Sequence, residues 1–108
     1  MCRQGFRWRL AELIARLTAV DRLVTTLARD RDAGRRVPPH EVSSLKWLAS
    51  ELAFEAADFA LQTSGAAGYQ SDTVENVLFR DARAFRLGEG TSETQLETIA
   101  RGVTGVPS

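Results

Sequence analysis

The segment LGEGTSETQ occupies residues 87–95, and two other segments precede it: QTSGAAGY at residues 62–69 and FRDAR at residues 79–83. It holds Glu89 between two glycines, which let a backbone bend sharply and approach a ligand closely. Thr91 or Ser92 can cap a following helix, and Ser92 with Gln95 has the spacing of a capping box. The segment therefore predicts a carboxylate beside a helix N-terminus, where unpaired N–H groups point outward.

Two long helices are predicted before this segment, because apolar residues recur at steps of three and four. The first runs from about Phe6 to Ala33 and ends near Gly34, with an apolar face made of Leu10, Leu13, Ile14, Leu17, Val20, Val24 and Leu27. Pro39 suits the first turn of the second helix. That helix runs from about His40 to Ser64 and ends at Gly65, with a face made of Val42, Leu45, Ala49, Leu52, Ala56 and Phe59.

Two shorter helices follow. One is capped by Ser71 or Asp72 and reaches about Phe85, with Val74, Val77 and Leu78 facing inward. The other runs from about Ser92 to Arg101, after which Gly102 and Gly105 end it. No segment alternates apolar and polar residues as a strand does. We therefore expect an all-α fold, a helical bundle of two long antiparallel helices plus two short helices, forming a single domain over residues 1–108.

The composition excludes several classes of protein. Apolar residues make up 44% and charged residues 26% of the 108 residues, as in folded globular domains. Basic and acidic residues number 14 each, which argues against nucleic-acid binding. Cys2 is the one cysteine, so we expect no internal disulfide and no metal cluster, as fits a cytoplasmic protein. No apolar run is long enough for a membrane span or a signal peptide.

The three segments, taken together and in this order, resemble the C-terminal domain of the acyl-CoA dehydrogenase flavoenzymes. That family shows a Gln followed by a glycine-rich turn ending in Gly-Tyr, then Arg-Asp-Ala-Arg, then Glu-Gly-Thr-Ser. All of these appear here at compatible spacing, and a weaker likeness extends back to about Gln4. The resemblance implies that helical domain and a role in α,β-dehydrogenation of an acyl-CoA thioester.

The resemblance also implies roles for individual residues. Glu89 would be the catalytic base that removes the α-proton of the acyl-CoA, while FAD accepts the β-hydrogen as hydride. Thr91 and Glu93 would contact the flavin cofactor, and Gln62 and Gly65 would reach the ADP half of FAD in a neighbouring subunit. Without the resemblance, Glu89 is an exposed loop acid beside a helix dipole. Thr91 and Glu93 then only cap a helix, and Gln62 and Gly65 form a helix end and turn.

Other polar residues have structural interpretations. Arg80, Asp81 and Arg83 are expected to form ion pairs that fix the turn between the short helices. Lys46 matches a lysine of the family and is expected to be structural. His40 is expected to cap a helix or face solvent. Trp8 is expected to pack partially at a helix end, with contact to a partner as the alternative.

The likeness covers the C-terminal part of the family's architecture, without its N-terminal helical domain, its middle domain or the first helix of its bundle. We therefore expect the chain's partners to be itself, a larger acyl-CoA dehydrogenase-like subunit, or both, with no turnover by the isolated chain. The alternative is a non-catalytic helical interaction or oligomerisation module derived from that family. Ala66, which replaces a family glycine, favours the alternative, whereas the retained Glu-Gly-Thr-Ser favours catalysis.

Overall fold

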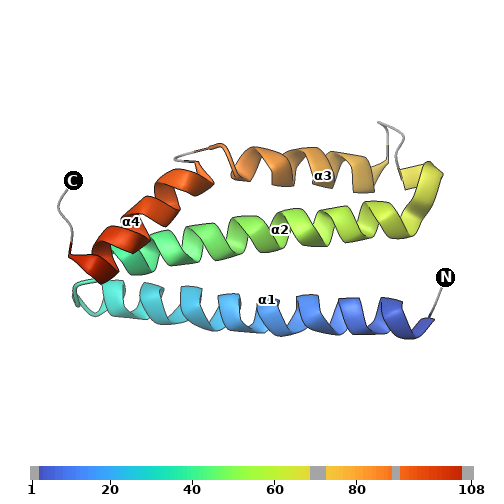
Figure 1. Ribbon diagram of the computed structural model, residues 1–108. Coiled ribbons are helices and arrows are strands. Elements are labelled where there is room, and N and C mark those ends of the chain that lie inside the picture. The colour runs from blue at the N-terminus through green and yellow to red at the C-terminus, as the bar shows by residue number, and fades with distance from the viewer. Residues whose placement is uncertain (1–2, 69–72, 89–90, 106–108) are drawn as a thin grey trace.

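The computed structural model describes residues 3–68, 73–88 and 91–105, which form four α-helices. These are α1 (Arg3–Asp32), α2 (Pro39–Gly68), α3 (Val74–Phe85) and α4 (Ser92–Thr104). α1 and α2 run antiparallel, and α2 lies between α1 and the pair formed by α3 and α4 (Figure 1). The predicted all-α fold of two long and two short helices is confirmed.

The ends of the long helices follow from glycine and proline. Gly34 adopts a φ of 75° just after α1, and the N–H of Arg35 donates to the carbonyl of Asp30, which satisfies a carbonyl at the helix end. Pro39 is the first residue of α2. Gly65 has φ 63° and ψ −145°, which are not helical angles, so the regular helix is interrupted at the residue where its end was predicted, and a short helical segment continues beyond this kink to Gly68.

The short helices differ from the prediction at three points. The N-cap of α3 is Thr73, whose side chain accepts from the N–H of Asn76, whereas Ser71 and Asp72 lie outside the described residues. The predicted inward residues Val74, Val77 and Leu78 are 69%, 48% and 51% exposed. Asn76 and Ala82 are buried instead, because α3 turns a face of small residues and Phe79 toward α2.

Gly102 does not end α4 but lies within it, and the helix ends at Gly105, which has a φ of 70°. A Cβ added to Gly102 would lie 2.5 Å from the Cβ of His40, so the glycine is what lets α4 cross the start of α2 so closely. His40 was predicted to cap a helix or to face solvent, but it lies inside α2, which begins at Pro39, and is half-buried against α4.

The described helices form an open array. α2 packs against each of the other three helices, whereas α1 packs against α2 alone. The buried apolar residues are few: Leu13, Leu27, Leu52, Ala57 and Ala82. The radius of gyration is 16.6 Å, against about 13 Å for a compact domain of this length. Much of the apolar face of α1 consequently faces solvent.

Candidate functional site

The N-terminus of α4 is fixed by Thr91. This residue has extended backbone angles, and its Oγ1 accepts from the N–H of Thr94 at 3.2 Å, while its carbonyl accepts from the N–H of Gln95. The cap is thus Thr91 with Thr94, not the Ser92–Gln95 pair that the sequence also allowed. Glu93 lies exposed in the first turn, where a negative charge stabilises the helix dipole.

The segment between α3 and α4 is held at both ends by one residue of α2. Oε1 of Glu51 accepts from Nε of Arg86 at 2.9 Å and from Oγ of Ser92 at 3.3 Å. In addition, the N–H of Ser92 donates to the carbonyl of Arg86 at 3.2 Å. The Glu51 side chain is only 17% exposed. The two ends of the Leu87–Thr91 segment are therefore closed into a loop and attached to the middle of α2.

Aromatic packing strengthens the same junction. The Arg86 guanidinium lies 5.0 Å from the centre of the Phe54 ring, which packs against Phe79 with centroids 5.3 Å apart. Arg83 lies 6.0 Å from the same ring. In the described part of the chain, Arg80, Asp81 and Arg83 form no ion pair, so the ion pair at this turn is Arg86 with Glu51.

Sequence reasoning missed Glu51 and Arg86. Arg86 directly precedes the LGEG segment, and this position was the available signal. Glu51 is one of several acids in α2, and nothing in the local pattern distinguishes it from the others. Lys46 bonds to Ser50 within α2, which agrees with a structural role.

The predicted catalytic residue Glu89 lies outside the described residues, as does Gly90. The described residues that flank this gap are Gly88 and Thr91. Just outside them, Arg86 and Ser92 are both bonded to Glu51. The structure therefore describes the support of this loop.

Gln62 and Gly65 lie far from that loop, toward the other end of α2 (Figure 1). Gln62 is exposed and borders a shallow hollow of about 310 Å³ beside Gly5, Phe6 and Phe59. At 1.5 Å per residue, Gln62 is about 16 Å along the helix from Glu51. The structure thus brings Thr91 and Glu93 together and keeps Gln62 and Gly65 apart from them.

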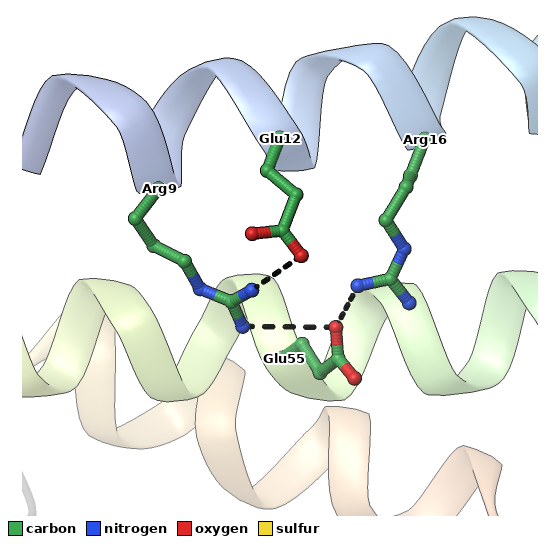
Figure 2. A network of polar contacts seen from close by, with 4 residues as sticks. All are labelled: Arg9, Glu12, Arg16 and Glu55. Atoms are coloured by element: carbon green, nitrogen blue, oxygen red, sulfur yellow. Dashed lines mark hydrogen bonds and ion pairs between the residues drawn. The ribbon is translucent and has the colours of Figure 1, made fainter.

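A second polar cluster joins α1 to α2 and has a structural role. Arg9 and Arg16 of α1 both approach Oε2 of Glu55, and Arg9 also pairs with Glu12 (Figure 2). Opposite charges balance within this cluster, and its side chains are 35–57% exposed. Among the described residues, no group of three His, Cys, Asp or Glu side chains is arranged to hold a metal ion.

Comparison with known protein families assigns the chain to one of them. The family model described as "Acyl-CoA dehydrogenase, C-terminal domain" matches residues 1–104. The chain belongs to the acyl-CoA dehydrogenase family. No helix in the described part of this family member is long and apolar enough to cross a membrane.

Individual relatives agree with this assignment. The 3-(aryl)acrylate reductase of Clostridium sporogenes is 36% identical over 90% of this chain and 26% of its own length. The acryloyl-CoA reductase (NADH) of Anaerotignum propionicum is also 36% identical, over 93% of this chain and 25% of its own length. The short/branched chain specific acyl-CoA dehydrogenase of Rattus norvegicus is 35% identical, over 93% and 23%. The chain therefore spans about a quarter of the length of these relatives.

Proposed function

We propose that this chain is the C-terminal helical part of an acyl-CoA dehydrogenase-like flavoenzyme and is inactive alone. It acts there as one helical domain in an oxidoreductase of the cytoplasm, where acyl-CoA binds in the assembled site. The observation that carries the proposal is the attachment of the loop ends at Arg86 and Ser92 to the same oxygen of Glu51. A loop that bears a catalytic acid needs such fixed ends, since small displacements of a reacting group reduce rates greatly.

Glu89 is the proposed base. Its carboxylate takes the proton from Cα of the acyl-CoA thioester, and the thioester carbonyl delocalises the electron pair left on Cα. When bound, FAD supplies the acceptor for the hydride that leaves Cβ, so that a Cα–Cβ double bond forms. The place of Glu89 between two glycines allows the carboxylate to approach the substrate closely.

Gln62 and Gly65 fit the nucleotide half of FAD. Gln62 presents an exposed amide, which can donate and accept hydrogen bonds. Gly65 has a positive φ, and a Cβ there would meet nothing within 4 Å, so the backbone at this kink is open to a ligand. The distance of these residues from the loop agrees with contact to FAD in a neighbouring subunit.

Thr91 and Glu93 differ in which part of FAD each can contact. The Thr91 hydroxyl already caps α4, but a hydroxyl keeps further hydrogen-bonding capacity. The Glu93 carboxylate is exposed in the first turn and can accept hydrogen bonds from the ribityl or ribose hydroxyls of FAD. Repulsion between like charges disfavours contact of Glu93 with the pyrophosphate. We assign both residues to the polyol part of the cofactor.

The names of two relatives suggest that the same chemistry can run in reverse, as a reduction. Two of them are named reductases, one of acryloyl-CoA and one of 3-(aryl)acrylate. In that direction the protonated Glu89 carboxyl group would give a proton to Cα, and a bound reduced flavin would supply the hydride to Cβ. The non-catalytic interaction module remains the other candidate, favoured by the exposed apolar residues of α1.

The test is the visible absorption spectrum of the protein purified gently from its native host with any bound partner retained. We expect a flavin spectrum in an assembly with a larger chain, and bleaching of the flavin when an acyl-CoA is added. Glu89→Gln should keep the flavin spectrum and abolish bleaching, whereas the matched variant Glu97→Gln, at an exposed acid of α4 outside the proposed site, should still bleach. A colourless, partner-free protein, or unchanged bleaching in Glu89→Gln, would overturn the proposal.

A further inference from the structure

Glu51, Arg86 and Ser92 are joined in a closed triangle of hydrogen bonds. Oε1 of Glu51 accepts from Nε of Arg86 at 2.9 Å and from Oγ of Ser92 at 3.3 Å. The third side is the bond from the N–H of Ser92 to the carbonyl of Arg86, at 3.2 Å. Each residue is thus bonded to both of the others, so none of the three can shift without straining two bonds.

The Arg86 side chain is held in its orientation as well as in its place. Phe54 lies one turn after Glu51 in α2, on the same face of the helix. The Arg86 guanidinium bonds to Glu51 and lies 5.0 Å from the centre of the Phe54 ring. That ring packs in turn on Phe79 of α3. Because a guanidinium is planar, one bond and one ring contact leave it little freedom to rotate.

The helix that follows the segment is fastened to α2 at a second point. Gly102 of α4 lies against His40, near the start of α2. Ser92 and Gly102 are about 15 Å apart along α4, at 1.5 Å per residue. Their partners Glu51 and His40 are about 16 Å apart along α2. Since the two spacings are nearly equal, α4 is held at both points, and its N-terminus cannot slide along α2 without disturbing both.

The attachment adds no net charge beside the segment. The Glu51 side chain is 17% exposed, and the guanidinium of Arg86 balances its negative charge. An unpaired carboxylate in such a place would repel a second carboxylate nearby and disfavour its ionised form. A proton acceptor has to be ionised to act, so a neutral ion pair is a suitable support for a segment that carries one.

We propose that Glu51 is a positioning residue for the base, acting through Arg86 and Ser92 and not by contact with the acyl-CoA. This inference rests on the proposed function, which assigns Glu89 as the base. In the sequence, Glu89 stands three residues after Arg86 and three before Ser92. Proton transfer requires a carboxylate within hydrogen-bond reach of the proton. Glu51 therefore sets the rate of the chemical step, whereas binding of acyl-CoA depends on other groups.

Hydrogen exchange of the Ser92 amide in the full chain tests the support directly, without flavin or substrate. Glu51→Ala should speed this exchange about 10-fold, because the side-chain bonds that hold the triangle are lost. Glu51→Gln keeps an oxygen acceptor for both donors and should speed it only about 3-fold, since neutral bonds are weaker. The matched control Glu97→Ala removes an exposed acid of α4 and should leave the rate unchanged.

The rate of flavin bleaching in the native assembly tests the effect on the base. At saturating acyl-CoA, Glu51→Ala should lower this rate about 100-fold, the loss that a displacement of about 1 Å can cause. The acyl-CoA concentration that gives half the maximal rate should stay unchanged, because ground-state binding is not altered. Glu51→Gln should recover most of the rate, and Glu97→Ala should bleach as the original chain does. Circular dichroism at the assay temperature checks that every variant keeps its helices.

The inference is wrong if Glu51→Ala leaves the Ser92 amide as protected as Glu97→Ala does. It is equally wrong if a folded Glu51→Ala assembly bleaches at the original rate, or if only the half-saturating acyl-CoA concentration changes. A Glu51→Gln variant as slow as Glu51→Ala would show that the charge of Glu51 acts, and not the bonds that it accepts. A colourless assembly would overturn the proposed function, and the exchange of the Ser92 amide would still decide whether Glu51 holds this segment.

Discussion

α2 is packed very differently on its two sides. On one side α4 approaches so closely that Gly102 has no room for a Cβ beside His40, and Glu51 holds both ends of the loop between α3 and α4. On the other side α1 contacts α2 along one edge and leaves Leu10, Ile14 and Leu17 exposed. The tightly packed side supports the candidate catalytic loop, whereas apolar residues of α1 are exposed on the open side.

The largest expected effect comes from closing the space at Gly102. Replacing a glycine by alanine within a helix normally stabilises it by about 1 kcal/mol. Here Gly102→Ala should instead lower the free energy of unfolding by about 2 kcal/mol, because the new Cβ would overlap His40. Urea denaturation at a fixed chain concentration measures the change. His40→Ala should not rescue the variant, since the Cβ of residue 40 remains in place. If Gly102→Ala were instead more stable than the original chain, α4 would not pack tightly on the start of α2.

Removal of the Glu51 carboxylate should have the next largest effect on the free energy of unfolding. Glu51→Ala should lower the free energy of unfolding by about 1.5 kcal/mol, because Arg86 and Ser92 lose the acceptor that they share. The control is Glu97→Ala, which removes the exposed pair with Arg101 and should cost only about 0.3 kcal/mol. Equal costs for the two variants in urea denaturation would mean that Glu51 does not support the loop.

Loss of the helix cap at Thr91 follows. Thr91→Ala should cost about 1 kcal/mol of stability, since the N–H of Thr94 loses its acceptor, while Thr91→Ser should keep the cap. Thermal unfolding followed by circular dichroism compares the two variants. If both are as stable as the original chain, the cap does not contribute and a direct cofactor role becomes the better explanation of this threonine.

The smallest effect is expected on the open side of α2. Glu55→Gln weakens the pairs with Arg9 and Arg16, whose side chains are about one-third exposed. Solvent screens such pairs, so the cost should be about 0.5 kcal/mol. A cost as large as that of Glu51→Ala would mean that α1 is held as firmly as α4, and the contrast between the two sides would disappear.

The sequence predicted the fold class and the helix ends where a residue type forces the backbone, as at Gly34 and Pro39. It failed where packing between helices decides. Val74 and Leu78 are apolar and correctly spaced, but the face of α3 that packs on α2 carries Asn76 and Ala82. Gly102 has the appearance of a helix terminator, and only the position of His40 shows why it lies inside α4.

The candidate site was predictable to a similar degree. The order of the three segments identified the family and the proposed roles of Gln62, Gly65, Glu89, Thr91 and Glu93, which stay predictions. The residue that fastens the loop, Glu51, comes from a helix 35 positions before Arg86 in the sequence. Such a long-range contact leaves no local pattern, so the support of the loop became visible only in the folded chain.

The attachment of α1 to α2 alone has a consequence for local unfolding. α2, α3 and α4 are consecutive in the chain, and α3 and α4 both pack on α2, so the three helices form a natural cooperative unit. α1 can detach by breaking a single interface. Its backbone amides should therefore exchange with deuterium sooner than those in the middle of α2.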